Sequence, residues 1–268
     1  MIGIFDSGLG GLTVFKEVAK ALPGYRLLYL GDTARTPYGN RSQDLIYKFT
    51  KEAVEYLFRQ GCQLVIIACN TASAEALRKI QREWLSKNYP ERRVLGVIRP
   101  VAEEASQATK SGRIGVVGTR ATVSSGAYGR ELEALKPGVK VFSQACPLLV
   151  PLIEEGQAKR PETMKILRNY VRPLKAQKID TLILGCTHYQ FLYRQFKSAG
   201  QKGIKVLDSA KITAEKLKDY LARHKEIEVK LEKGGANRFL ATDLTENFKK
   251  IARDWLGEEV KLEKVDLG

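Results

Sequence analysis

The chain has 268 residues, of which 44% are hydrophobic and 28% are charged, and a formal net charge of +15 at pH 7. Its length suits one large globular domain or two of ordinary size, and we expect a cytoplasmic protein, because no apolar run approaches the roughly 20 residues of a membrane helix and no signal peptide is evident. The Lys and Arg residues are scattered along predicted helices beside acidic residues, so we expect a solvated surface that favours anions and not a nucleic-acid groove.

Predicted strands and helices alternate along the whole chain. Strands are expected at 2–5, 26–30, 63–68, 95–98, 113–117, 139–142, 180–185, 204–207, 238–241 and near 260. Helices are expected to end near residues 22, 60, 87 and 177 and to span 245–255, with others after 100, 119 and 209. This alternation favours an α/β fold with mainly parallel sheets.

A glycine-rich loop, DSGLGG at 6–11, lies between the first strand and the first helix. Glycines at this place let the backbone approach a ligand closely, and the start of the helix favours a carboxylate or phosphate. The spacing is not the GxGxxG of dinucleotide-binding proteins, so NAD is not expected. Asp6 and Ser7 are good helix caps, but an Asp at the end of the first strand is also well placed to act on a ligand.

Two apolar runs end in the same way, with a thiol and small polar residues. QLVIIACNTAS at 63–73 carries Cys69, and DTLILGCTHY at 180–189 carries Cys186. Each run predicts a parallel strand that is buried on both faces and has Cys at its carboxyl end. Since open α/β sheets bind ligands outside the carboxyl ends of their strands, we expect both thiols in the functional site. After Cys69, Asn70 or Thr71 is expected to cap the next helix.

The second half of the chain repeats the pattern of the first, beginning with a strand, a Gly-Thr turn and a helix at 113–120. We therefore predict two similar α/β domains with mainly parallel sheets, each of which supplies one thiol to a cleft between them. The last helices and strands are expected to complete the first domain, which makes it discontinuous. The predicted domains are 1–96 with 208–268, and 97–207.

The four cysteines are expected to be free thiols, since a chain of this size with an evident core does not need disulfides. Their spacing forms no CxxC or His-rich metal pattern, and no Lys stands in a recognisable pyridoxal context, so we expect neither a metal nor an organic cofactor. Cys62 and Cys146 are interpreted as small buried hydrophobes.

Four motifs together resemble those of cofactor-independent glutamate racemase. They are DSGLGGLT at 6–13, GDTAR with PYG at 31–39, ACNTA at 68–72 and GCTHY at 185–189. The resemblance spans most of the chain. It implies two α/β domains that face each other across the active site, a homodimer, no cofactor, and the supply of D-glutamate for peptidoglycan synthesis.

The resemblance also implies which residues form the site. The two acid/base thiols and their three assisting groups would be Cys69, Cys186, Asp6, His188 and Glu154. The alignment leaves Glu155 as an alternative to Glu154. The substrate contacts would be Asp6, Ser7, Tyr38, Gly39, Asn70, Thr71, Thr119, Thr187 and His188.

Racemisation removes a weakly acidic Cα proton from one face of an amino acid and returns a proton to the other face. A thiolate and a thiol on opposite faces do this without either group moving around the substrate. Cys suits the role because its pKa of about 8.5 can be brought near neutrality by nearby donors and charges. Backbone N–H groups and hydroxyls at helix starts are available to stabilise the carbanion.

Three other functions fit parts of the sequence. A relative in the same superfamily would act on aspartate or a hydantoin, although the DSGLGG opening favours glutamate. A basic nucleic-acid-binding protein on the same scaffold would need neither thiol, and both are present. A thiol hydrolase with His188 as its base would leave one Cys without a role.

Overall fold

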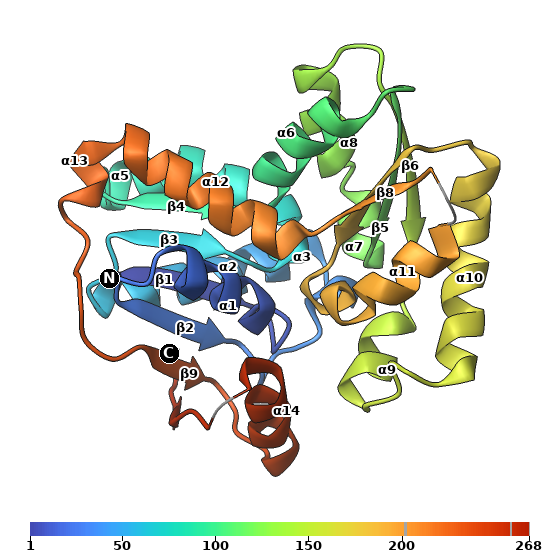
Figure 1. Ribbon diagram of the computed structural model, residues 1–268. Coiled ribbons are helices and arrows are strands. Elements are labelled where there is room, and N and C mark those ends of the chain that lie inside the picture. The colour runs from blue at the N-terminus through green and yellow to red at the C-terminus, as the bar shows by residue number, and fades with distance from the viewer. Residues whose placement is uncertain (201–202, 258, 268) are drawn as a thin grey trace.

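The computed structural model describes residues 1–200, 203–257 and 259–267, and it contains two β-sheets side by side, each with helices on both faces (Figure 1). Within these residues every pairing between the named strands is parallel. The fold class predicted from the sequence, α/β with two mainly parallel sheets, is confirmed.

The larger sheet has six strands in the order β10-β9-β2-β1-β3-β4. Their bounds are β1 Ile2–Asp6, β2 Leu27–Gly31, β3 Leu64–Ile67, β4 Arg93–Gly96, β9 Arg238–Ala241 and β10 Leu262–Lys264. Strands β1, β2 and β3 are completely buried, as expected for apolar parallel strands at the centre of a sheet covered on both faces. Asp6 pairs with Gly31, so β1 and β2 end together at the same edge of the sheet.

The smaller sheet has four strands in the order β6-β5-β7-β8. Their bounds are β5 Arg113–Gly118, β6 Lys140–Ala145, β7 Thr181–Gly185 and β8 Lys205–Leu207. Strand β7 is completely buried, whereas the edge strand β6 is only partly buried. The apolar run before Cys186 therefore lies inside the smaller sheet, as the run before Cys69 lies inside the larger one.

The helices and helical turns connect these strands. They are α1 Leu12–Ala21, η1 Tyr38–Asn40, α2 Gln43–Arg59, α3 Asn70–Glu75, α4 Leu77–Lys79, η2 Ile80–Leu85, α5 Ser86–Asn88, α6 Ile98–Ala108, α7 Arg120–Ser124, α8 Ala127–Leu135, α9 Leu149–Glu154, α10 Pro161–Ala176, η3 Thr187–Leu192, α11 Tyr193–Gly200, α12 Ser209–Arg223, α13 Lys225–Glu228 and α14 Glu246–Leu256.

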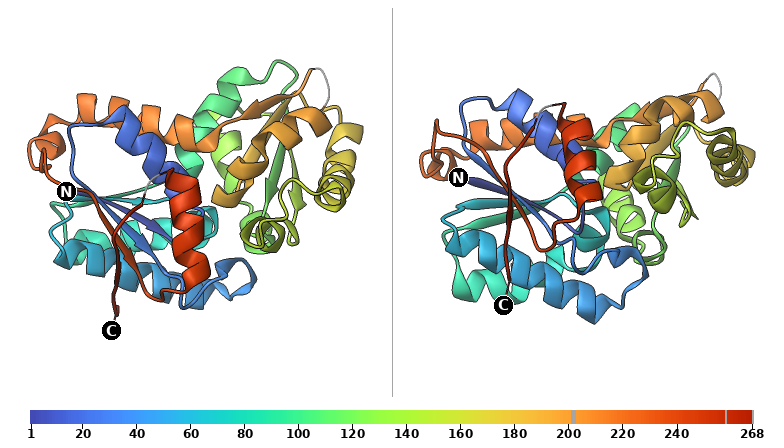
Figure 2. Two further views of the ribbon diagram at one scale, coloured as in Figure 1. Left: turned by 60° about the horizontal axis from the view of Figure 1, so that its bottom comes forward. Right: turned by 90° about the horizontal axis from the view of Figure 1, so that it is seen from below.

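Each sheet has an apolar core on both faces. On one face of the larger sheet, α1, α12 and α14 contribute Val18, Leu217 and Ala252 to one cluster, and both views of Figure 2 show α14 beside α1. On the other face, α2 contributes Leu57 to a second cluster. The smaller sheet is covered by α9, α10 and α11 on one face and by α6 and α8 on the other. These layers leave the strand ends and their loops to form the site.

Two predicted elements are wrong in detail. The strand expected at 95–98 is β4, which lies at Arg93–Gly96. Its pairing with β3 ends at Gly96, opposite Ile67, the last residue of β3. Helix α6 begins at Ile98. The single helix expected up to residue 87 is interrupted, since Ala76, with φ −115°, separates α3 from α4 and residues 80–85 form a π-helix.

The strands of the larger sheet lie within 1–96 and 208–268, and those of the smaller sheet lie within 97–207. The domain boundaries themselves, at 96/97 and 207/208, stay a prediction. None of the helices in the described part of the chain has the length and apolar character needed to cross a membrane.

Candidate active site

The carboxyl ends of β1, β3 and β7 carry three of the predicted catalytic side chains. Asp6 is the last residue of β1, Cys69 follows β3, and Cys186 comes directly after β7. Side chains join the loops of the two sheets, because Thr187 Oγ1 donates to Asp6 Oδ2 at 3.3 Å and Thr13 Oγ1 lies 3.4 Å from the carbonyl oxygen of Thr187. The structure therefore brings the strand ends of both sheets to one place.

Cys69 is buried, with 6% of its surface exposed, and it is the N-cap of α3. Its Sγ accepts a hydrogen bond from Ala72 N at 3.4 Å and lies 3.2 Å from Ser7 Oγ. Burial raises the pKa of Cys69 to about 12, and the charge of Asp6 adds to the rise, whereas the hydrogen bonds with Ser7 and Ala72 oppose it. Cys69 is therefore a thiol in the ligand-free protein at neutral pH.

Cys186 begins a chain of three groups. Its Sγ lies 3.9 Å from His188 Nδ1, and His188 Nε2 lies 2.9 Å from Glu154 Oε1. Burial lowers the pKa of His188, but the interactions with Cys186 and Glu154 outweigh burial and raise the pKa to about 10. The imidazole is therefore protonated at neutral pH. Glu155, the alternative from the sequence, is exposed to solvent, so the carboxylate beside His188 is that of Glu154.

Asp6 links the surroundings of the two thiols. Its Oδ1 accepts a hydrogen bond from Gly8 N at 3.0 Å, and its Oδ2 accepts the one from Thr187. Burial raises the pKa of Asp6, and the nearby charge of His188 lowers it. Asp6 in turn raises the pKa of Cys69. A change in the charge of His188 therefore affects the ionisation of Asp6, and through Asp6 the pKa of Cys69.

The predicted helix caps Asn70 and Thr71 are wrong, because both residues are already helical and Cys69 holds the cap position of α3. Asn70 is buried and accepts a hydrogen bond at 2.7 Å from the hydroxyl of Tyr128, which comes from α8 beside the smaller sheet. The start of α3 is thus tied to the other half of the molecule.

A group of three threonine hydroxyls lies beside the start of α3. Thr71 Oγ1 is 2.9 Å from Thr119 Oγ1 and 3.2 Å from Thr122 Oγ1, and Thr119 and Thr122 are 3.0 Å apart through the same atoms. Thr119 is the N-cap of α7 in the smaller sheet's half of the chain. Gly39 packs against it, since an added Cβ at Gly39 would lie 2.9 Å from Thr119 Cβ.

Tyr38 directs its hydroxyl away from this group. Its side chain is 1% exposed and its hydroxyl donates a hydrogen bond to Asp32. The hydroxyl of Tyr38 is therefore already engaged within the protein, which leaves the main chain of Tyr38 and Gly39 available for the predicted substrate contact. All the substrate contacts inferred from the sequence stay predictions.

A family model described as Asp/Glu/Hydantoin racemase matches residues 2–217 of the chain. The chain belongs to the Asp/Glu/Hydantoin racemase family. Glutamate racemase of Aquifex aeolicus (strain VF5) is 44% identical over 97% of this racemase-family chain and 95% of its own length.

Two solved structures of glutamate racemases are similar to this chain over nearly its whole length. The crystal structure of glutamate racemase isoform RacE1 from Bacillus anthracis has a TM-score of 0.92 and 37% identity, and the alignment covers 100% of this chain and 97% of that one. The structure of glutamate racemase from Francisella tularensis subsp. tularensis SCHU S4 in complex with D-glutamate has a TM-score of 0.89 and 32% identity, with 99% and 97% covered.

Sequence reasoning missed three polar residues of this racemase-family site, namely Asp32, Thr122 and Tyr128. Thr122 follows the predicted contact Thr119 by three residues, which places both on one helical turn, so helix spacing could have found it. Asp32 stands inside the GDTAR motif but carried no assigned role. Nothing in the sequence indicates that Tyr128 reaches α3.

The remaining cysteines of this family member, Cys62 and Cys146, are completely buried, and all four thiols are free. Their interpretation as small buried hydrophobes and the expectation of free thiols are confirmed. Among the described residues, no three or more His, Cys, Asp or Glu side chains are grouped as metal ligands would be.

Proposed function

We propose that this protein is a glutamate racemase that interconverts L- and D-glutamate by proton transfer between the substrate Cα and two thiols. The observation that carries the proposal is the placement of Cys69 and Cys186 after buried strands of two different sheets, each beside its own hydrogen-bonding partners. The similarity to glutamate racemases over nearly the whole chain supports the choice of substrate.

In the proposed reaction, a thiolate removes the Cα proton from one face and the other thiol donates a proton to the opposite face. Burial keeps Cys69 protonated in the ligand-free protein, and the protonated His188, 3.9 Å from Cys186 Sγ, is placed to be the counter-ion when Cys186 acts as the base. In the direction in which Cys69 donates its proton, Cys186 abstracts the Cα proton. After that turnover the proton lies on Cys186, and the opposite direction begins from this state.

Loss of the Cα proton places negative charge on the substrate. The first-turn N–H groups of α3 that lack a partner within the helix, together with the hydroxyls of Thr71 and Thr119, are donors held in place before the reaction. Their fixed orientation favours the charge that develops at the carbanion. Glu154 supports His188 by a hydrogen bond and does not itself receive the Cα proton.

Aspartate is the second candidate substrate, because the family description covers aspartate and hydantoin racemases as well. Aspartate is one methylene shorter than glutamate, and a methylene changes kcat/KM by about 10- to 200-fold in a fitted site. We expect the larger kcat/KM with glutamate. A larger value with aspartate would move the protein to that branch of the family.

The wider context is also part of the proposal. We place the reaction in the cytoplasm, where free thiols persist. Its product, D-glutamate, is assigned to peptidoglycan synthesis. The active form of the protein is proposed to be a homodimer. Sedimentation velocity of the purified chain tests the assembly, with a species of twice the chain mass expected.

The direct test of the activity is the decay of the circular-dichroism signal of L-glutamate, and separately of D-glutamate, with no added cofactor. We expect both signals to decay to zero, because racemisation ends at equal amounts of the two enantiomers. Treatment with EDTA or with a pyridoxal-trapping reagent should leave the rate unchanged. Activity that is lost with EDTA and restored by a metal would refute the thiol-only mechanism.

A further inference from the structure

One buried carboxylate anchors the loop that carries the GDTAR and PYG motifs. Asp32 is completely buried and comes directly after β2. Its N–H donates to the carbonyl oxygen of Asp6 at 3.0 Å, so the first residue of the loop lies beside the end of β1. Asp32 forms hydrogen bonds to neither thiol, and the proposed proton transfer gives it no role.

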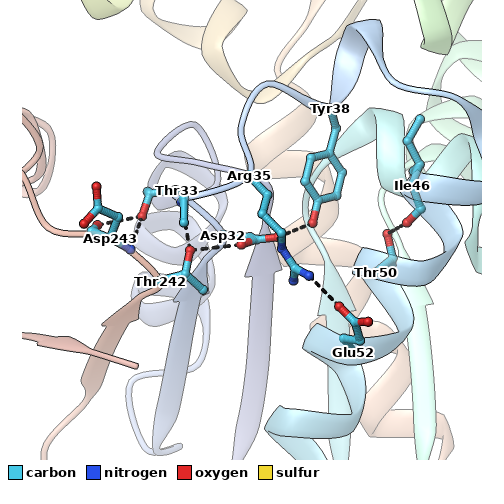
Figure 3. A network of polar contacts seen from close by, with 10 residues as sticks. Asp32, Thr33, Arg35, Tyr38, Ile46, Thr50, Glu52, Thr242 and Asp243 are labelled. Carbon is cyan, nitrogen blue, oxygen red and sulfur yellow. Dashed lines mark hydrogen bonds and ion pairs between the residues drawn. The ribbon is translucent and has the colours of Figure 1, made fainter. Parts of the chain in front are cut away.

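Three donors from separate segments converge on this carboxylate (Figure 3). Asp32 Oδ2 accepts from Arg35 Nε at 2.7 Å and from the hydroxyl of Tyr38, and Oδ1 accepts from Thr242 Oγ1 at 2.9 Å. Thr242 follows β9, almost at the end of the chain in sequence. The carboxylate is thus held by its own loop, by the turn η1 and by the C-terminal part of the larger sheet.

The donors on Asp32 are themselves fixed. The guanidinium of Arg35 forms an ion pair with Glu52 of α2 and lies 4.2 Å from the ring centroid of Phe49. The ring of Tyr38 also packs on Phe49, with 5.7 Å between centroids. Burial raises the pKa of Tyr38, and Asp32 adds to the rise, so the phenol stays a hydrogen-bond donor. A buried carboxylate with several fixed donors defines one position of the loop.

The anchored loop faces the site from two directions. Gly39 lies against Thr119, where an added Cβ would come within 2.9 Å of the threonine Cβ. Three residues earlier the loop covers the segment after β1, since an added Cβ at Gly8 would lie 3.2 Å from Thr36 Oγ1. The position of this loop therefore sets the space between the end of β1 and the hydroxyl group at Thr119.

We propose that Asp32 is a positioning residue that fixes the turn at Tyr38 and Gly39, so that the main chain of this turn meets the substrate in one orientation. The inference rests on the proposed racemase function. Because Asp32 acts through the turn and not on the thiols, its loss weakens substrate binding more than proton transfer.

The test compares Asp32→Asn and Tyr38→Phe with the wild-type protein in KM and kcat for both enantiomers and in hydrogen exchange of the amides at 36–41. Asp32→Asn keeps the size of the side chain but presents an N–H group to at least one of its donors. We expect KM to rise about tenfold or more, with a smaller change in kcat. Tyr38→Phe, which removes a single donor, should raise KM less, and exchange at 36–41 should be faster in both variants.

Asp180→Asn is the matched control. Asp180 is also a carboxylate that organises a loop, since it accepts from Thr109 Oγ1 at 2.6 Å and from the N–H of Ser111 at 2.6 Å, but it lies before β7, at the opposite end of that strand from Cys186. The control should lower the melting temperature without changing KM or exchange at 36–41.

An unchanged KM together with wild-type exchange at 36–41, in a folded Asp32→Asn protein, would overturn the positioning role. If Asp32→Asn does not fold, the same two measurements on Tyr38→Phe decide the question. A wild-type protein that does not racemise glutamate would refute the proposed function, and the exchange at 36–41 would then still test the anchoring by Asp32.

Discussion

Cys69 and Cys186 hold equivalent positions after buried parallel strands, yet their neighbours carry opposite charge. Cys69 lies near the Asp6 carboxylate, which together with burial raises its pKa, whereas Cys186 lies beside a protonated His188. Equal placement and unequal electrostatics suit a pair of groups that must be in opposite protonation states when the substrate arrives. The two thiols are therefore expected to act on different enantiomers.

Single replacements of the two thiols test this division. Ser is a far weaker acid and base than Cys, so Cys69→Ser and Cys186→Ser should each reduce racemisation by about a thousandfold. A glutamate analogue with a leaving group on Cβ needs only proton abstraction for elimination. Each variant should therefore eliminate from the enantiomer that faces its remaining thiol, so the two variants should have opposite preferences. The resemblance to glutamate racemase implies that Cys186→Ser acts on the D form and Cys69→Ser on the L form.

The measurement is the rate of elimination from each enantiomer by each variant, monitored as the amount of leaving group that is released. Cys146→Ser is the control, because Cys146 is a buried thiol that follows a strand of the smaller sheet, as Cys186 does, but has no role in the proposed reaction. The same enantiomer preference in Cys69→Ser and Cys186→Ser would mean that the thiols do not flank the substrate, and the two-base mechanism would have to be abandoned.

The position of each thiol could be predicted because it depends on local pattern and on one rule of topology. A buried apolar run predicts a parallel strand, and ligands bind where such strands end. The hydrogen bonds of Tyr38 and Tyr128 could not be predicted in this way. Each joins elements that are distant in sequence, so their geometry follows from tertiary packing and not from spacing along the chain.

At the level of elements, the loop before α1 packs tightly against the loop that follows β7. An added Cβ at Gly10 would lie 2.2 Å from Thr187 Oγ1 and 2.5 Å from His188 Nδ1. Real Cβ atoms do not come this close, so any side chain at this position must displace the loop that carries Cys186 and His188. The glycine-rich loop thus allows two segments of the chain to pack closely, in addition to any approach of its backbone to the substrate.

Gly10→Ala should therefore lower kcat by about a hundredfold, since a shift of about 1 Å in the catalytic loop has an effect of this size. Gly129→Ala is the matched control, because Gly129 is inside α8 and an added Cβ there meets no atom within 4 Å. The control should keep wild-type kcat and gain about 0.5–1 kcal/mol of stability. Wild-type kcat in Gly10→Ala would contradict the close approach.

The strands were easier to predict than the helices. Central strands such as β1 and β7 are buried on both faces, and their apolar runs end where polar loop residues begin. The segment 70–88 has helical composition throughout, yet it is divided near Ala76 and contains a π-helix at 80–85. Such a division depends on how the segment packs over the larger sheet, which periodicity does not report.

For the whole molecule, the sequence indicates a second series of strands that begins near residue 113 and further strands that follow it, and the structure places β9 and β10 in the same sheet as β1. The structure adds that β9 and β10 extend the larger sheet beyond β2. Through Thr242 this C-terminal part of the sheet also contacts Asp32. The C-terminal segment is therefore connected to the site by a side-chain contact that no motif indicated.

The buried thiols make a property of the whole molecule depend on pH. Burial raises the pKa of Cys62 and of Cys69 to about 12, and burial also raises the pKa of Cys146. In the unfolded chain a thiol loses its proton near a pKa of about 8.5. Between these values the native state binds more protons than the unfolded state, so the free energy of unfolding falls as pH rises. The stability from these groups is fully present below about pH 8.5.

Urea unfolding in reducing buffer at about pH 8 and about pH 11 should show this loss, with a slope of up to about 1.4 kcal/mol per pH unit for each thiol. Cys62→Ala is the informative variant, because Cys62 lies before β3, at the opposite end of that strand from Cys69. Below about pH 8.5, removing its sulfur should lower stability by a constant amount. Above that pH the difference from the wild-type protein should shrink, because the alkaline slope of the variant is shallower by the share of one thiol. If the variant and the wild-type protein lose stability at the same rate above pH 9, Cys62 does not retain its proton in the native state and burial does not control its titration.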